Sequence, residues 1–139
     1  MNLLNTYLDD QLSRGRGYLV KADAMKALGQ SSTAFAAAAA RLIRKRRLVR
    51  PKQGFYLVVR PEDRAAGAPD PARWIDPLMR HLGVDYRISL LRAAAVHGAS
   101  HQAAQVFQVI VPKQIRVINI GRQRIQFVYQ TPHVFAKPS

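Results

Sequence analysis

The sequence predicts an α+β fold in which an N-terminal winged helix-turn-helix is followed by a small α+β module of two helices and a β-sheet. Two observations support the first part: an alanine-rich helix with a basic end, and a β-branched and aromatic stretch directly after it. A third observation, a series of β candidates between residues 106 and 129, supports the second part.

The basic helix is expected to begin near Ser32, because a side-chain oxygen of a serine or threonine there can accept a first-turn N–H group. A helical wheel places four residues on one side, Phe35, Ala39, Leu42 and Arg46. The other side holds Thr33, Ala37, Arg41 and Arg44. We expect the first side to pack and the second to be free to meet a partner.

A hairpin is expected directly after the basic helix, over residues 48–59. Its β-branched and aromatic residues surround the turn candidate Lys52-Gln53-Gly54, and Pro51 is tolerable only in an edge strand. A basic helix followed at once by a basic-tipped hairpin is the sequence outline of a winged helix-turn-helix.

Three elements are expected before the basic helix. Leucine and tyrosine recur at helical spacing from residue 2 to residue 13, which predicts an amphipathic helix that ends around residues 14–17. Residues 18–20 are a short β candidate, and residues 22–28 form the next helix, which Gly29 is placed to terminate. The short turn after Gly29 leads into the basic helix.

Residues 61–73 concentrate proline, glycine and small residues, so we expect a linker between one domain of residues 1–60 and another of residues 74–139. Helical spacing returns over residues 72–82, where Pro77 delays the expected helix start to about Asp76.

The rest of the second domain is expected to contain one more helix, from Tyr86 to Val96, and then a sheet. Its three β candidates are residues 106–111, 116–120 and 125–129, of which the last two are joined as a hairpin by residues 121–124.

The charge is strongly unbalanced: 22 lysines and arginines face 8 aspartates and glutamates, which gives a net charge of +14. Residues 1–60 hold 12 basic and 3 acidic side chains, and residues 86–139 hold 7 basic and none acidic, whereas residues 61–85 hold 3 basic and 5 acidic. Such an excess indicates a polyanionic partner, either nucleic acid or anionic lipid. The absence of cysteine excludes a disulfide framework and a thiolate metal site.

The location is expected to be cytoplasmic, with no membrane partner. The first residues lack the basic region and long apolar core of a signal peptide. The longest low-polarity run, from Ala34 to Ala40, is far shorter than the ~20 residues that span a bilayer.

Double-stranded DNA is the expected partner. In helix-turn-helix proteins the second helix enters the major groove with its N-terminal residues near base edges, and basic residues farther along meet phosphates. The expected DNA-binding residues are Ser31, Ser32, Thr33, Ala37, Arg41, Arg44, Lys45, Arg50, Lys52 and Gln53. Because the exposed helix face is mostly alanine, base specificity is expected to be modest or to depend on the hairpin and on DNA shape.

A solvated helix face is the alternative interpretation of this basic stretch. Seven lysines or arginines occur between Arg41 and Lys52 without one acidic residue, so the i,i+4 ion pairs that make such a face useful cannot form. The composition therefore favours a nucleic-acid contact.

Enzymatic function is not expected, and neither is a cofactor. Residues 86–139 contain no aspartate or glutamate, which removes carboxylate pairs for acid–base chemistry and carboxylate clusters for Mg²⁺. His97 and His101 are four residues apart, but Gly98 interrupts the helix between them, so a capping or packing role is favoured over a metal site. Ser89 with His97 lacks the orienting acid of a nucleophile and base pair.

Three segments carry a resemblance to a known family. They are residues 17–32, the stretch from Leu42 to Tyr56, and residues 86–98 with Tyr-Arg-Ile-Ser-Leu at the start and Ala-Val-His-Gly at the end. In this order and spacing the chain resembles the AbiEi-like antitoxins, transcriptional regulators of bacterial type IV toxin-antitoxin and abortive-infection systems.

The resemblance implies that the N-terminal module binds inverted repeats in its own promoter and represses it. It also implies that the second module supports antitoxin activity against a nucleotidyltransferase-like toxin without a stable complex. Such proteins generally continue well past the basic hairpin, whereas this sequence ends at Ser139, so autorepression is the property we expect first. An RNA-binding or toxin-binding module without sequence-specific DNA recognition stays open, with Arg116, Arg122 and Arg124 as its contacts.

Overall fold

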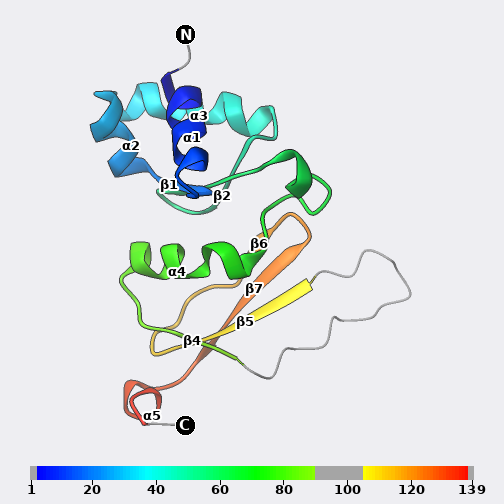
Figure 1. Ribbon diagram of the computed structural model, residues 1–139. Helices are drawn as coiled ribbons and strands as arrows, with labels where there is room; N and C mark the ends of the chain where they lie inside the picture. Colours follow the sequence, from blue (N-terminus) through cyan, green and yellow to red (C-terminus); the bar gives the residue numbers. More distant parts are fainter. Residues whose placement is uncertain (1–2, 90–104, 138–139) are drawn as a thin grey trace.

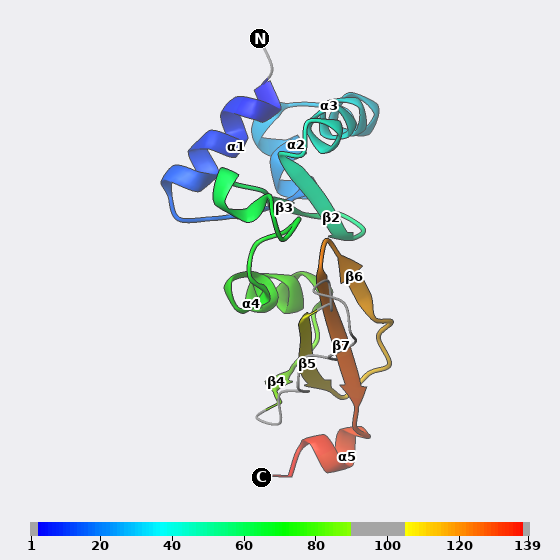
Figure 2. The same cartoon turned by 90° about the vertical axis from the view of Figure 1, so that its right-hand side faces the viewer.

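The computed structural model describes residues 3–89 and 105–137. It has the predicted α+β class. Figures 1 and 2 show the elements in layers: three helices at the N-terminal end, a small sheet beneath them, a fourth helix, and a second sheet that leads to the C-terminus.

The first layer consists of the helices α1 (Leu3–Ser13), α2 (Lys21–Leu28) and α3 (Ser32–Arg44). All three confirm the elements expected from the sequence, within one residue at most boundaries. Helix α3 begins as predicted, because the Ser31 hydroxyl accepts a hydrogen bond from the Ala34 N–H at 3.1 Å. Gly29, with φ +62°, ends α2 in the left-handed conformation that glycine tolerates best.

A three-stranded sheet follows, formed by β1 (Tyr18–Val20), β2 (Leu48–Lys52) and β3 (Phe55–Val58) in the order β1-β3-β2. The predicted hairpin is therefore present as β2 and β3. Strand β2 is an edge strand with an irregular register between Val49 and Lys52, which is where a proline can be accommodated.

This small sheet is buried on both faces. Leu19, Leu48 and Tyr56 pack into the core of the three helices. Phe55 and Leu57 point to the other face and pack into a second core with helix α4 and the second sheet. Consequently all four residues of β3 are buried, and the two halves of the chain share one sheet.

Helix α4 (Pro71–Leu82) follows a single 3₁₀ turn, Pro61–Asp63. The predicted start near Asp76 is wrong, since the helix begins five residues earlier and contains Pro77 in its interior. Asp70 caps its first turn by accepting from the Ala72 N–H at 3.1 Å. Burial along one side of α4 outweighs the cost of about 3 kcal/mol of an internal proline; its buried residues are Pro71, Trp74, Ile75, Leu78 and Met79.

The second sheet has the order β4-β5-β7-β6, from β4 (Arg87–Ile88), β5 (Gln105–Val111), β6 (Ile118–Ile120) and β7 (Gln123–Tyr129). Strands β5 and β7 are parallel, and the other pairs are antiparallel. These strands confirm the three β candidates and the β6–β7 hairpin.

The start of the predicted helix over residues 86–96 is wrong, because Arg87 and Ile88 form strand β4 and pair with Ile110 and Val109 of β5. The later part of that predicted helix, from residue 90, lies outside the described residues. A short terminal helix, α5 (Pro132–Phe135), was not expected from the sequence; Thr131 caps it.

The stretch expected to be a linker makes close contacts with the second sheet. An ideal Cβ on Gly121 would lie 2.3 Å from the Ala66 carbonyl oxygen, so the β6–β7 turn fits there only without a side chain. The Arg122 N–H donates to that same oxygen at 2.8 Å, and Gln123 Nε2 donates to the Ala68 carbonyl at 3.1 Å. These contacts fix the second sheet against residues 66–68.

Asp63 stabilises the same stretch from within. Its carboxylate accepts from the Arg60 N–H at 3.1 Å and from Arg60 Nε at 2.9 Å. Burial by itself would raise the pKa of Asp63, but the hydrogen bonds from Arg60 and the charge of its guanidinium hold the pKa below its ordinary value.

Candidate nucleic-acid interface

Helix α3 has the two faces that the helical wheel predicted. Phe35, Ala38, Ala39 and Leu42 are buried in the core of the helical layer. Thr33, Ala37, Arg41 and Arg44 are all exposed on the opposite side. The side of α3 that is free to meet a partner therefore carries small residues in its first half and arginines in its second half.

The placement of Arg46 on the packed face is wrong. Helix α3 ends at Arg44, and Arg46 is exposed with φ +59°. The Arg46 N–H donates to the Ile43 carbonyl at 3.0 Å and the Arg47 N–H to the Leu42 carbonyl at 2.9 Å. This is the Schellman pattern of helix termination, in which the residue after the C-cap turns left-handed and leaves the helical face.

Arg47 is tied to the fold rather than free for a partner. Its guanidinium donates to the Asn5 side-chain oxygen and, at 3.2 Å, to the Asp9 carboxylate. Both partners come from α1, 38 and 42 residues away in the sequence. No acidic residue lies near Arg47 in the sequence, so the sequence did not indicate this contact.

The other six basic residues of this stretch have no acidic side chain within ion-pair distance in the described ranges 3–89 and 105–137. They are Arg41, Arg44, Lys45, Arg46, Arg50 and Lys52. Arg41 and Arg44 lie in the last turn of α3, where positive charge is favoured by the helix dipole. Arg50 and Lys52 lie in strand β2, so the helix dipole does not account for their charge.

The serines at the start of α3 differ in what they can offer a ligand. Ser31 uses its oxygen as the acceptor of the helix cap, so its O–H remains available as a donor. Ser32 is exposed like Thr33. These hydroxyls lie at the N-terminal end of α3, about two turns before Arg41.

The hairpin does not project freely from the molecule. The Gly54 carbonyl accepts from the Lys21 N–H at 2.9 Å, and the Gln53 carbonyl lies 3.0 Å from His81 Nε2. Arg50 and Gln53 are exposed, while Lys52 is half-buried. Of the expected hairpin contacts, Arg50 and Lys52 belong to strand β2, and Gln53 belongs to the turn, which is held from both sides.

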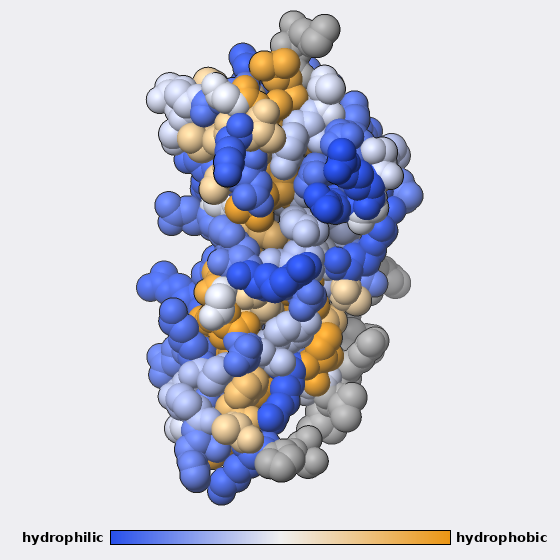
Figure 3. All heavy atoms as spheres, turned by 60° about the vertical axis from the view of Figure 1, so that its left-hand side comes forward, coloured by the Kyte–Doolittle hydropathy of each residue, from blue (hydrophilic) through white to orange (hydrophobic). Residues whose placement is uncertain are grey.

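Lys52 lines a groove of about 250 Å³ between the hairpin and the β5–β6 connection. Lys113 and Arg116 also line the groove, together with three half-buried apolar residues, Leu82, Val84 and Ile115. On the face drawn in Figure 3, strongly hydrophilic residues cross the waist of the molecule between the helical layer and the lower half. Sequence reasoning missed Lys113, because only the fold brings it next to the hairpin.

The three arginines weighed as alternative contacts are not equivalent. Arg116, Arg122 and Arg124 are all exposed. Arg124 donates to the Asn119 side-chain oxygen at 3.1 Å across the β6–β7 hairpin, whereas Arg116 lines the groove next to Lys52. The structure therefore brings Arg116, but not Arg124, into the basic groove.

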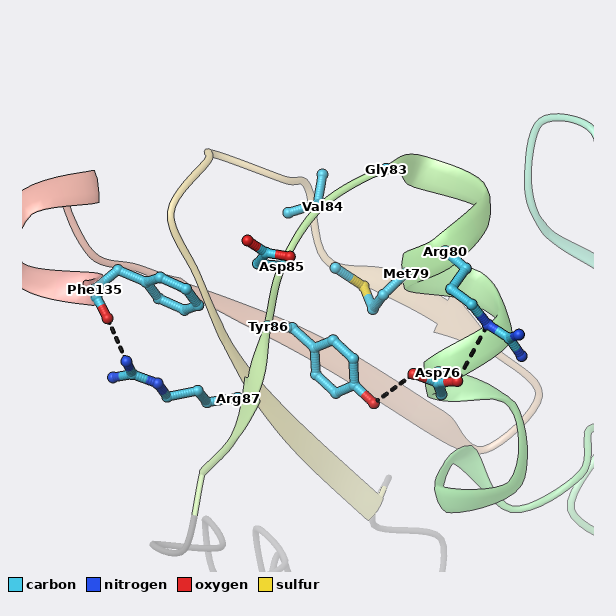
Figure 4. A pocket seen from close by; sticks show the side chains of 9 residues that line it. All are labelled: Asp76, Met79, Arg80, Gly83, Val84, Asp85, Tyr86, Arg87 and Phe135. Carbon is cyan, nitrogen blue, oxygen red and sulfur yellow. Dashed lines mark hydrogen bonds and ion pairs between the residues drawn. The ribbon is translucent and has the colours of Figure 1, made fainter. Parts of the chain in front are cut away.

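A larger cleft of about 590 Å³ lies between α4, the 83–87 segment and α5 (Figure 4). Asp76 accepts from the Tyr86 hydroxyl at 3.2 Å and pairs with Arg80 at 3.2 Å. The pKa of Tyr86 is raised by burial and by its hydrogen bond to Asp76.

Arg87 closes one end of this cleft. Its guanidinium donates to the Phe135 and Lys137 carbonyls and lies 4.6 Å from the centroid of the Phe135 ring. Two aspartates and two arginines line the cleft, so it lacks the positive charge of the groove next to the hairpin. Its chemistry does not favour a phosphate backbone.

In the part of the chain that the structure describes, no three His, Cys, Asp or Glu residues gather in a metal-binding arrangement. His97 and His101 lie outside the described residues, so the structure describes neither the His97–His101 pair nor the Ser89–His97 pair. Among the helices within residues 3–89 and 105–137, none is long and apolar enough to cross a membrane.

One comparison with known proteins gives a match. Residues 87–138 match the family model described as the AbiEi antitoxin C-terminal domain. No curated protein and no solved structure gives a significant match. The matched segment includes β4, β5, β6, β7 and α5, and it starts at Arg87, which holds α5 in place.

Proposed function

We propose that this chain, whose resemblance to the AbiEi-like antitoxins is confirmed by the match over residues 87–138, is the DNA-binding antitoxin of a type IV toxin-antitoxin system. The match supports the antitoxin role. In the proposal, residues 1–60 act as a winged helix-turn-helix that binds inverted repeats in the promoter of its own operon in the cytoplasm. The β2–β3 hairpin is the wing, and residues 74–139 form the antitoxin module.

The single observation that supports DNA binding best is the exposed side of α3. It faces away from the core, it ends in two arginines, and no acidic side chain within the described residues neutralises them. A duplex needs such uncompensated positive charge, because phosphate neutralisation with counterion release supplies much of the affinity.

The roles divide along the chain. The leading residues of α3, which are Ser31, Ser32, Thr33 and Ala37, approach base edges in the major groove. The trailing basic residues and the wing, which are Arg41, Arg44, Lys45, Arg50, Lys52 and Gln53, hold the phosphate backbone. Lys113 and Arg116 continue this positive surface past Lys52.

The antitoxin module antagonises a nucleotidyltransferase-like toxin without forming a stable complex. The cleft in Figure 4 belongs to this module and carries no net positive charge, unlike the exposed side of α3, so we assign the two activities to different elements. Loss of DNA binding through α3 therefore leaves protection from the toxin intact.

A direct test is the affinity for the promoter duplex as a function of salt, measured by fluorescence anisotropy. Arg41→Gln and Arg44→Gln should each weaken binding and flatten the slope of log affinity against log salt by about 0.9. Arg14→Gln removes the same charge from α1, where Arg14 pairs with Asp10 at 3.2 Å, and serves as the matched control. Unchanged affinity and slope in both α3 variants would contradict the placement.

The alternative is an RNA-binding or toxin-binding basic module. It is favoured by one observation: Lys52, Lys113 and Arg116 line one groove, and a positively charged groove can follow the backbone of a single strand. A higher affinity for single-stranded RNA than for the promoter duplex, lost on Arg116→Gln but not on Arg44→Gln, would replace the DNA proposal. Co-purification of the toxin would support toxin binding instead.

A further inference from the structure

We propose that His81 of α4 is a positioning residue for DNA binding: it fixes the wing by hydrogen bonding to the hairpin turn and does so without contacting DNA. This inference rests on the proposed function. It goes beyond it by assigning a role in DNA affinity to a residue of the second half of the chain.

The hydrogen bond has a defined direction. The Gln53 carbonyl oxygen can only accept, so His81 Nε2, at 3.0 Å, carries the hydrogen and donates. The neighbouring Gly54 has φ +76°, and an ideal Cβ there would lie 3.4 Å from the imidazole ring. The imidazole is therefore packed directly against the turn as well as bonded to it.

The same turn is connected to the helix pair. The Gly54 carbonyl accepts from the Lys21 N–H, the first residue of α2, at 2.9 Å. Phe55, which follows the turn, stacks on Tyr18 of β1 with ring centroids 5.7 Å apart and contacts the His81 ring at 5.6 Å. The two successive carbonyls of the turn are thus held by different halves of the chain.

Lys52 is the residue whose position depends most on this arrangement. It directly precedes Gln53, it ends strand β2, and it is half-buried in the groove with Lys113 and Arg116. Strand β2 has an irregular register just before Lys52, so regular pairing alone does not fix the end of the strand. When His81 no longer holds the turn, Lys52 gains freedom, and ordering it on DNA costs affinity.

Two substitutions separate the hydrogen bond from ring packing. His81→Phe keeps a planar ring against Phe55 and removes the donor, whereas His81→Gln keeps an N–H donor and removes the ring. His133→Leu is the matched control, since His133 is an exposed histidine on α5. His81→Leu is a second donor-free variant for use if His81→Phe does not fold.

Promoter-duplex binding should be about three- to tenfold weaker in His81→Phe, the range expected for one lost hydrogen bond. The salt slope should flatten by up to about 0.9, because the phosphate contact of Lys52 is weakened. His81→Gln should bind within about twofold of the wild type. The double variant, His81→Phe with Lys52→Gln, should bind the duplex no more weakly than Lys52→Gln alone, because both residues act through one contact.

Wild-type affinity in His81→Phe overturns the proposal. So does an equal loss of affinity in His81→Phe and His81→Gln, and so do losses of binding free energy from His81→Phe and Lys52→Gln that are fully additive. Backbone amide shifts of Gln53 and Gly54 give a readout that needs no DNA: they should move in His81→Phe and stay near wild type in His81→Gln. If the wild-type chain does not bind the duplex, the function proposed above fails, and unmoved amide shifts would separately show that His81 does not fix the turn.

Discussion

Arg46 and Arg47 are neighbours in the sequence, yet the fold uses them in different ways. Arg46 takes the left-handed position of the helix terminus, which is unusual for a residue with a side chain. Arg47 reaches back to Asn5 and Asp9 of α1 and links the end of α3 to the first helix. A count of the basic residues from Arg41 to Lys52 therefore overestimates the charge available to a partner by one arginine.

Asp63 gives a residue-scale prediction that depends on pH. Because its pKa is lower in the folded chain than in the unfolded one, the ionised carboxylate stabilises the fold above the unfolded pKa of about 3.9. This contribution is lost as the pH falls through the folded pKa. Asp63→Asn should cost about 1.5 to 3 kcal/mol at about pH 6, as for hydrogen bonds to charged groups.

Urea unfolding of the wild type and of Asp63→Asn at a series of pH values tests this prediction. The difference in unfolding free energy between the two should shrink as the pH is lowered from about 6 to about 3. A difference that stays constant over this range would show that the Arg60–Asp63 hydrogen bonds do not depend on the charge.

At the scale of elements, the two faces of α3 predict opposite sensitivities to substitution. Leu42→Ala removes a fully packed side chain and should destabilise the chain by ~2 to 5 kcal/mol. Ala37→Ser changes an exposed position and should alter the unfolding free energy by less than about 0.5 kcal/mol. Chemical denaturation measures the loss of unfolding free energy in both variants. A larger loss in Ala37→Ser than in Leu42→Ala would contradict the docking of α3.

The local elements could be predicted from the sequence because their causes are local. Ser31 caps α3, Gly29 ends α2, and β-branched and aromatic residues on both sides of the turn at residues 53–54 indicate the hairpin. The start of α4 was placed wrongly because an internal proline is unfavourable by itself, and only the burial of Trp74 and its neighbours compensates it. Tertiary contacts thus overrule a local preference in this helix.

Contacts between distant elements were beyond prediction from one sequence. The two-residue strand β4 exists because it pairs with β5, about 20 residues away. The interaction of His81 with the hairpin turn joins positions 28 residues apart. For the candidate site, the helical wheel identified the exposed face of α3 correctly. No sequence pattern predicts that α1 binds Arg47 or that Lys113 lies next to Lys52.

At the scale of the whole molecule, the small sheet joins the two halves. Its faces belong to two cores, the linker stretch is hydrogen-bonded to the β6–β7 turn, and the hairpin turn contacts α4. In this arrangement, the second half of the chain holds the proposed DNA-binding unit, residues 1–60, in one geometry. Helix α3, which carries most of the proposed DNA surface, and helix α5, which contributes Phe135 to the cleft, lie toward opposite ends of the molecule in Figure 1.

In the proposed function, α3 recognises sequence with its first half and supplies affinity with its second half. The decisive experiment compares promoter and scrambled duplexes at one matched salt concentration, for Thr33→Ala and Arg44→Ala. Thr33→Ala should reduce the preference for the promoter by roughly 1 to 3 kcal/mol if a base contact is lost. Arg44→Ala should weaken both duplexes alike, as a phosphate contact does.

Matched salt is required because an electrostatic loss can otherwise be mistaken for lost specificity. Equal weakening of both duplexes by Thr33→Ala, together with a selective loss of promoter binding in Arg44→Ala, would reverse the two roles. Unchanged binding of both duplexes in both variants would contradict the claim that α3 is the recognition helix.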